Sequence, residues 1–250
     1  MSGIHVHAMY RHGATPLHRW PPQVAIATTV GFVIAVVLTP REAMWAFGLY
    51  ASMAIAALVL ARLPPGFVGA RLLVLAPFLI AAASLPLLEG PPDALWGLSR
   101  EGLWDAWNIA AKGMLGATAS VVLAATHEPP DLVTGLERLR VPRVVTAIMG
   151  FMVRYLELVV GEVARMRVAM RSRGHRARGV AAMAPVGRAL GSLFIRVYER
   201  GERVFLAMAS RGYRGTMPAS GAVATASAWA AGAGVVVLAA VAATIAAVTT

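Results

Sequence analysis

The chain has 250 residues, and its composition restricts the kinds of protein it can be. Hydrophobic residues make up 58% of it and charged residues only 14%, with a mean hydropathy of +0.66. An ordinary soluble domain carries roughly a quarter charged residues, so this balance predicts an integral membrane protein. The chain has no cysteine, which excludes disulfides and thiolate metal sites.

Positive charge is concentrated in one stretch of the chain. The formal net charge is +11, and residues 131–214 hold 16 Arg against 6 acidic residues, while residues 215–250 hold no charge at all. Basic residues close to spanning helices resist translocation across the bilayer. We therefore expect a multi-pass protein of the cell inner (plasma) membrane whose Arg-rich module, residues 131–215, is cytoplasmic.

An N-terminal tail over residues 1–22 precedes four apolar runs. A helix needs about 20 apolar residues to cross a bilayer, with about 17 as the short limit. The runs lie at roughly 23–39, 43–61, 72–88 and 103–125, separated or followed by Pro40-Arg41, Pro64-Pro65-Gly66, Gly90-Pro91-Pro92 and Pro129-Pro130. Because such Pro and Gly clusters are typical of turns, residues 23–125 are predicted to form a membrane domain with four spans.

A last apolar run covers residues 222–248 and contains no charge. The predicted fold class is therefore an all-α integral membrane protein with about five transmembrane helices and long amphipathic cytoplasmic helices. With the Arg-rich module in the cytoplasm, four preceding spans place the amino terminus inside the cell. The last helix then carries the carboxyl terminus outside.

Within the Arg-rich module, apolar residues follow the period of an amphipathic helix twice. The first stripe runs through residues 144–172, and the second follows Pro185 and extends to Met208. Arginines and acids lie largely on the other face of each stripe. This pattern predicts two long amphipathic helices lying at or under the membrane, each with a wet basic side.

A short basic motif lies at the carboxyl end of both predicted helices. "AMRSRGHR" at 169–176 returns as "AMASRGYR" at 207–214. The shared positions are Ala169, Met170, Ser172, Arg173, Gly174 and Arg176 in the first copy, and Ala207, Met208, Ser210, Arg211, Gly212 and Arg214 in the second.

Two interpretations of this repeat are open. Gly in the left-handed conformation commonly closes a helix and a cation favours its carboxyl end, so two ordinary helix ends explain the Gly and one Arg. Capping does not explain why the Ala-Met pair and the second Arg also recur. The alternative is a pair of docking heads for a two-fold pair of partner subunits, where Arg binds carboxylates through its planar fork.

The residues also resemble a known family. "GLERLRVPR" (135–143), "FMVRYLELVVGEVARMRVAMRSRG" (151–174) and "LGSLFIRVYERGERVFLAMASRGYRG" (190–215) are similar to the transmembrane coupling component of energy-coupling factor (ECF) transporters, most of all the CbiQ type from cobalt importers. "PLHRWPPQV" (16–24) resembles the segment before that family's first span. The similarity covers most of residues 16–215.

The resemblance implies a non-catalytic subunit that connects a substrate-binding membrane subunit to two ABC-type ATPases. The family's two Arg motifs fall on Ser172-Arg173-Gly174 and Ser210-Arg211-Gly212, with Met170, Arg176, Met208 and Arg214 as supporting docking residues. ATP and magnesium are then bound by the ATPases, and this chain carries no cofactor. Cobalt is the expected substrate, ahead of nickel and then a vitamin.

Other functions find less support in the sequence. No GxxxxGK[ST] loop and no catalytic triad or HExxH pattern is present, so neither ATP binding nor enzymatic activity is expected. His5, His7 and His12 lie in a tail without periodicity, and no metal site is predicted. Lys112 lies within the fourth run, and we favour a structural role for it. The alternative is a self-sufficient ion transporter or channel whose pathway is lined by Lys112. Nucleic-acid binding would not require two matched motifs.

Overall fold

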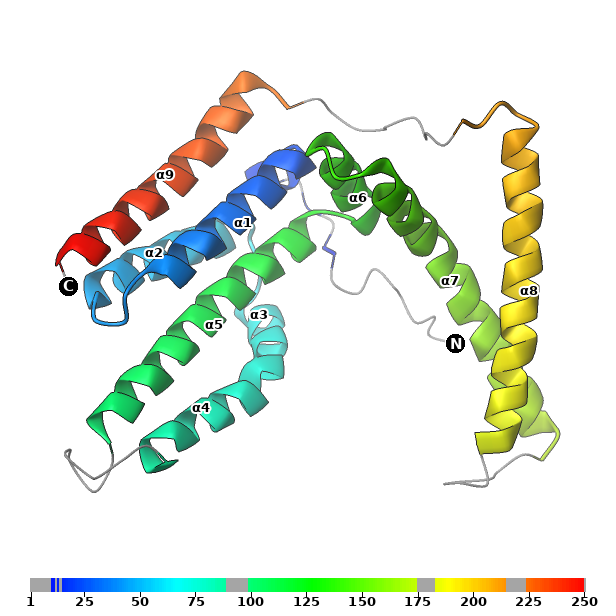
Figure 1. The fold of residues 1–250 in the computed structure, drawn as a ribbon, viewed down its shortest axis with the longest axis horizontal. Helices are drawn as coiled ribbons and strands as arrows, with labels where there is room; N and C mark the ends of the chain where they lie inside the picture. Colours follow the sequence, from blue (N-terminus) through cyan, green and yellow to red (C-terminus); the bar gives the residue numbers. More distant parts are fainter. Residues whose placement is uncertain are drawn as a thin grey trace. The chain divides into compact units, whose positions relative to one another are not determined.

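The computed structural model describes residues 10, 11, 13, 15–88, 99–174, 183–214 and 224–249. All regular structure in these residues is helical, as the composition predicts (Figure 1). The helices form two compact units, which we describe separately. The bundle unit comprises residues 9–135 and 221–250, and the Arg-rich unit comprises residues 136–220.

The bundle unit contains most of the apolar helices. They are η1 (Pro16–Arg19), α1 (Pro22–Leu38), α2 (Met44–Leu60), α3 (Pro65–Leu72), η2 (Leu73–Leu75), α4 (Ala76–Leu88), α5 (Arg100–Thr126) and α9 (Ala226–Thr249). The helix α6 (Pro129–Arg138) crosses the boundary between the two units along the chain. The Arg-rich unit contains α7 (Arg143–Ser172) and α8 (Met183–Ala209).

The predicted third span and two of the predicted breaks need correction. The run predicted to start at Leu72 is helical from Pro65, through α3, η2 and α4. Pro64 precedes this helix and Pro65 lies in its first turn, where the missing N–H removes no hydrogen bond. Pro129-Pro130 likewise begins α6 instead of ending helical structure. Proline pairs in this chain start helices as well as separate them.

Helix length and composition also change the expected set of spans. Within the described residues, four helical stretches are long and apolar enough to cross a membrane: Pro65–Pro86, Arg100–Thr126, Arg143–Ser172 and Ala226–Thr249. The apolar helices α1 and α2, with 17 residues each, fall at the short limit. The third stretch is α7, which was predicted above to lie at or under the membrane. Its length and composition are also compatible with a position that crosses the membrane.

Helix α9 packs closely against α1 along one side of the bundle unit (Figure 1). A Cβ atom added to Gly232 would lie 2.6 Å from the Thr28 hydroxyl oxygen, and one added to Gly31 would lie 2.8 Å from a Val236 methyl carbon. Both distances are too short for real contacts, so the two backbones approach closely only because glycine occupies these positions. Small residues play this part in membrane helix pairs generally.

A buried hydrogen-bond chain joins three helices at one end of this core. The hydroxyl of Tyr50, a fully buried residue, donates to the carbonyl oxygen of Ala239 in α9 at 3.1 Å. The Thr39 hydroxyl oxygen lies 2.9 Å from both the Tyr50 hydroxyl oxygen and the Ala35 carbonyl oxygen, and its single hydrogen is shared between these two acceptors. Buried polar groups are stable in an apolar core when they are paired in this way.

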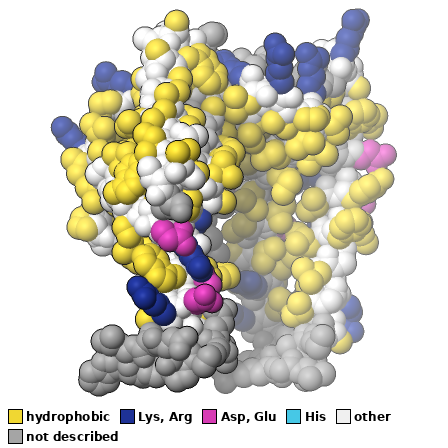
Figure 2. Space-filling model, turned by 60° about the vertical axis from the view of Figure 1, so that its left-hand side comes forward, with side chains coloured by type: hydrophobic (Ala, Val, Ile, Leu, Met, Phe, Trp, Pro, Cys, Tyr) yellow, Lys and Arg dark blue, Asp and Glu magenta, His cyan; other side chains and the backbone are white. Residues whose placement is uncertain are grey.

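The Arg-rich unit has almost no core. Thr146 and Leu193 are the buried residues among its described positions, and many large apolar side chains of α7 and α8 are more than half exposed. The amphipathic helices of this unit therefore present their apolar faces outward. The bundle unit, which Figure 2 brings forward, likewise shows many hydrophobic side chains on its surface.

Candidate functional site: two matched helix ends

The first copy of the repeat closes α7. The Arg173 N–H donates to the Ala169 carbonyl at 3.3 Å, and the Gly174 N–H donates to the Arg171 carbonyl at 3.0 Å. Gly174 has a φ of +73°, in the left-handed region that ends helices. The backbone leaves the helix at the position that the sequence pattern predicts.

The second copy closes α8 in the same way. The Gly212 N–H donates to the Ala209 carbonyl at 3.0 Å, and Gly212 has a φ of +82°. The hydroxyls of Ser172 and Ser210 each donate to the carbonyl three residues earlier, both at 3.0 Å. The two copies therefore share local geometry as well as sequence.

Side-chain exposure is also matched between the two ends. Arg173 and Arg211 are exposed, and Met170 and Met208 are both half-buried. No atom lies within 4 Å of a Cβ added to Gly174 or Gly212. Helix capping thus accounts for the two glycines, whereas neither of the two arginines has an ion-pair partner among the described residues.

The outer parts of the repeat are described only in part. Arg214 is exposed beyond the end of α8, while Arg176 lies outside the described residues. The structure therefore places the supporting residues Met170, Met208 and Arg214 beside the two helix ends.

An ion pair joins α7 to α8 away from both ends. The Glu162 carboxylate accepts from Arg196 of α8 at 2.8 Å and from Arg165 of its own helix at 2.6 Å. A small cavity beside this pair is lined by Leu158, Val159, Val197, Arg200 and Arg203. Sequence reasoning assigned no role to Glu162, because nothing in the pattern pairs it with a residue 34 positions away.

The two Arg motifs lie at the carboxyl ends of α7 and α8, and each is separated by a length of helix from the Glu162–Arg196 contact. At 1.5 Å per residue, Arg173 follows Glu162 by about 16 Å of helix, and Arg211 follows Arg196 by roughly 22 Å. Figure 1 shows the carboxyl end of α8 on the far side of the contact from the carboxyl end of α7. A partner that binds both motifs must therefore present two separated binding surfaces.

Lys112 in α5 has a structural contact. Its ammonium donates to the Val37 carbonyl at 2.9 Å. That carbonyl is in the last turn of α1, where four carbonyls lack helical partners and a positive charge is favourable. The sequence favours a structural role for Lys112, and this main-chain contact is compatible with that role.

Metal and polar clusters are sparse in the described part of the chain. No group of three or more His, Asp or Glu residues there could hold a metal ion. The tail histidines His5, His7 and His12 lie outside the described residues. His127, just after α5, is held by the Thr126 hydroxyl at 2.9 Å and the Trp20 carbonyl at 3.1 Å, and burial lowers the pKa of its imidazole.

Known proteins share this sequence over most of its length. The profile of the family described as cobalt transport protein, CbiQ, matches residues 13–220. The chain is 31% identical over 119 residues to an uncharacterized protein of Methanocaldococcus jannaschii, which covers 47% of this chain and 41% of that protein. It is 30% identical over 160 residues to the cobalt transport protein CbiQ of Rhodobacter capsulatus, covering 63% of this chain and 64% of that one.

A longer match reaches a related transporter component. The chain is 24% identical over 228 residues to the energy-coupling factor transporter transmembrane protein EcfT of Acidaminococcus fermentans, covering 82% of each chain. The match to the first two relatives spans less than two thirds of their length. The residues that match the family profile, 13–220, include both helix ends and the ion pair between α7 and α8. This multi-pass membrane protein belongs to the CbiQ family of cobalt transport proteins.

Proposed function

We propose that the chain is the transmembrane coupling subunit of an ECF importer, which transmits ATP-driven movement from two ABC-type ATPases to a substrate-binding membrane subunit. The matched geometry of the two Arg-bearing helix ends carries this proposal. Two exposed arginines, each preceding a left-handed glycine, suit two similar grooves on a pair of ATPases. The guanidinium fork suits carboxylates in those grooves.

The mechanism we propose is mechanical. When ATP closes the two ATPases, the docked ends of α7 and α8 move with them. The Glu162–Arg196 pair joins the two helices at one place, so displacement of their ends changes their tilt about that contact. The open and closed ATPase pairs must then bind the helix ends with different free energy, because a conformational change needs a differential interaction.

The exposed apolar faces of the Arg-rich unit suit a membrane partner. Large side chains of α7 and α8 lie 65% to 71% exposed at Val144, Met152, Phe194 and Tyr198. Contiguous exposed apolar surface marks interaction sites. We propose that the substrate-binding subunit and surrounding lipid cover these faces, and that tilting of the helices reorients that subunit.

The names of the relatives support a proposal for the transported substrate. One relative is named a cobalt transport protein, and the family carries the same description. We therefore propose cobalt as the substrate, with nickel as the closest competitor. Metal recognition would belong to the substrate-binding subunit, and ATP and magnesium to the ATPases, so this chain needs neither cofactor nor catalytic residue.

Membrane orientation follows from the charge. We propose that the Arg-rich unit faces the cytoplasm, where the ATPases and their ATP are located. Its excess of arginine beside spanning helices supports this orientation.

The direct experiment is removal of both docking arginines. In the assembled transporter, Arg173→Ala together with Arg211→Ala should abolish co-purification of the ATPases while the protein remains folded in membranes. Arg167→Ala together with Arg188→Ala is the matched control, because both arginines are exposed on the same two helices outside the motifs. Full recovery of the ATPases with the motif variant would overturn the proposal.

A further inference from the structure

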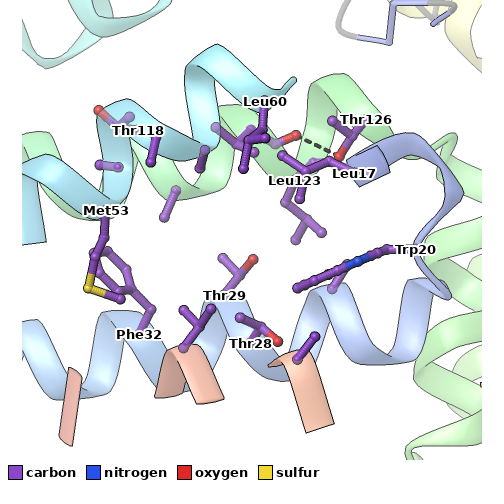
Figure 3. A pocket seen from close by; sticks show the side chains of 18 of the residues that line it. Leu17, Trp20, Thr28, Thr29, Phe32, Met53, Leu60, Thr118, Leu123 and Thr126 are labelled. Atoms are coloured by element: carbon purple, nitrogen blue, oxygen red, sulfur yellow. Dashed lines mark hydrogen bonds between the residues drawn. The ribbon is translucent and has the colours of Figure 1, made fainter. Parts of the chain in front are cut away.

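The bundle unit contains a cavity that the proposed coupling function does not use. It has a volume of about 500 Å³ and lies between α1, α2, α5 and α9. Figure 3 shows Phe32 and Met53 at one end and Trp20, Leu17 and Leu123 at the other. A volume of this size is typical of a small-molecule site, where roughly 300 to 1,000 Å³ is common.

The lining of the cavity is almost entirely apolar. Small residues keep it open, among them Ala57 of α2 and Gly234 of α9. A Cβ added to Gly234 would meet no atom within 4 Å, so the space there is unfilled by the protein. The surrounding helices are those assigned to the membrane, where water is excluded and lipid chains are the abundant apolar molecules.

Two arginines lie close in sequence to residues that line one end of the cavity. Arg19 directly precedes the lining residue Trp20, and Arg62 follows the lining residue Leu60 by two positions. The short helix η1, which contains Arg19, contacts α2, which ends just before Arg62. Both side chains are exposed, and neither has an ion-pair partner among the described residues.

Arg62 has an unusual backbone conformation just after the end of α2. Arg62 has a φ of +52°, in the left-handed region where glycine is the ordinary residue after a helix. A side chain other than glycine is strained there, and such positions are often tied to function. Arg62 therefore adds a permanent positive charge just after α2, two positions beyond the lining residue Leu60.

We propose that this cavity binds one acyl chain of an anionic phospholipid, whose phosphate is held by Arg19 and Arg62. The apolar lining suits an acyl chain, and the two arginines favour a negatively charged headgroup. Basic groups between spanning helices attract anionic headgroups in this way. The bound lipid would fill the space that the small residues of α2 and α9 leave beside α1.

Trp20 provides a direct probe of the cavity, because Figure 3 shows its indole among the lining side chains. We would replace the other five tryptophans with Phe, purify the protein in detergent and titrate it with phosphatidylglycerol carrying brominated acyl chains. Bromine quenches indole fluorescence on contact. The expected result is quenching that saturates at about one lipid per chain, with phosphatidylcholine of the same chains binding at least about fivefold more weakly.

A matched protein retains only Trp229, which is 41% exposed on α9 and is not among the cavity-lining residues. Its quenching should not saturate at one lipid and should not depend on the headgroup. Native mass spectrometry of the unaltered protein provides a second measurement that does not depend on the tryptophan replacements, and it should show one retained phosphatidylglycerol.

Two kinds of variant distinguish the contribution of the acyl chain to lipid binding from that of the headgroup. Ala57→Phe, or Gly234→Leu if the first variant does not fold, should eliminate the bound lipid by filling the cavity. Arg19→Gln with Arg62→Gln should remove the preference for phosphatidylglycerol while the acyl chain still quenches Trp20. Three results would each overturn the proposal: equal quenching by both headgroups in the protein that has Trp20 as its single tryptophan and keeps both arginines, retention of the lipid by a folded cavity-filling variant, or crosslinking of the cavity to a partner protein.

Discussion

The bundle unit and the Arg-rich unit bury their side chains to different extents. The bundle unit has a core around Tyr50, with glycines that bring α1 and α9 together. The Arg-rich unit has two buried residues among its described positions and joins its two long helices through an ion pair. The first unit can hold its shape through its own contacts. The second leaves its apolar faces uncovered, as the proposed coupling role between partner subunits requires.

The largest effect should come from the glycine contact of the bundle unit. Gly232→Ala places a methyl group 2.6 Å from the Thr28 hydroxyl and 2.7 Å from a Val24 methyl, and Val24 is fully buried. Overpacking of this kind costs about 2 kcal/mol. Thermal unfolding in detergent should show the loss, whereas Gly48→Ala, which meets no atom within 4 Å, should be neutral. Equal stability of the two variants would contradict a bundle held by this contact.

The ion pair of the Arg-rich unit should affect transport more than stability. Glu162→Arg places a third cation beside Arg165 and Arg196, so the two helices should separate at their contact. We expect cobalt uptake by the complete transporter to fall about tenfold, equivalent to about 1.4 kcal/mol. The ATPases should remain bound, because the two motifs are intact.

Reversal of both charges tests the same pair more sharply. Glu162→Arg combined with Arg196→Glu restores opposite charges across the contact and should recover most of the uptake. Glu202→Arg, at an exposed position of α8, is the control for charge alone. A double variant that transports no better than Glu162→Arg would show that the pair does not position the helices.

A smaller effect is expected at the buried hydroxyl of the bundle unit. Tyr50→Phe removes the donor to the Ala239 carbonyl and leaves Thr39 without its tyrosine partner. Loss of one hydrogen bond costs about 1 kcal/mol, so thermal unfolding should shift by less than for Gly232→Ala. An unchanged midpoint would mean that water or another group replaces the lost partner.

The smallest effect should be a pH dependence through His127. Burial lowers the pKa of its imidazole below the ordinary 6.5, so the folded state favours the neutral ring. This contribution is complete above pH 6.5 and is lost as the pH falls from 6.5 through the lowered pKa. Thermal unfolding between pH 8 and pH 5 should show the decline, and His127→Asn should remove it. The same slope in both proteins would assign the decline to other groups.

The helices could be predicted from the sequence better than their roles. Apolar length and period place α1, α2, α5, α7, α8 and α9 within a few residues of their observed bounds. The prediction was wrong at Pro65, where a helix begins instead of a break, because a proline pair is typical both of a break and of a first helical turn. Local patterns thus locate a helix without deciding how its ends are used.

The contacts between helices were largely outside the reach of the sequence pattern. Nothing local connects Lys112 with the Val37 carbonyl, or Glu162 with Arg196. The cavity between four helices likewise depends on how small residues from separate segments meet. The repeated motif at Arg173 and Arg211 could be predicted because the two copies share the same residues at the same spacing within eight positions.

Site-specific crosslinking from the two helix ends tests the central claim most directly. A photoreactive benzoylphenylalanine at Ser172 or Ser210, both exposed beside a docking arginine, would be activated in cells that contain the complete transporter. The account predicts that each position captures an ATPase subunit, while the exposed Ser52 of α2 captures none. Capture of lipid alone from both Ser172 and Ser210, in a transporter that is assembled and active, would contradict it.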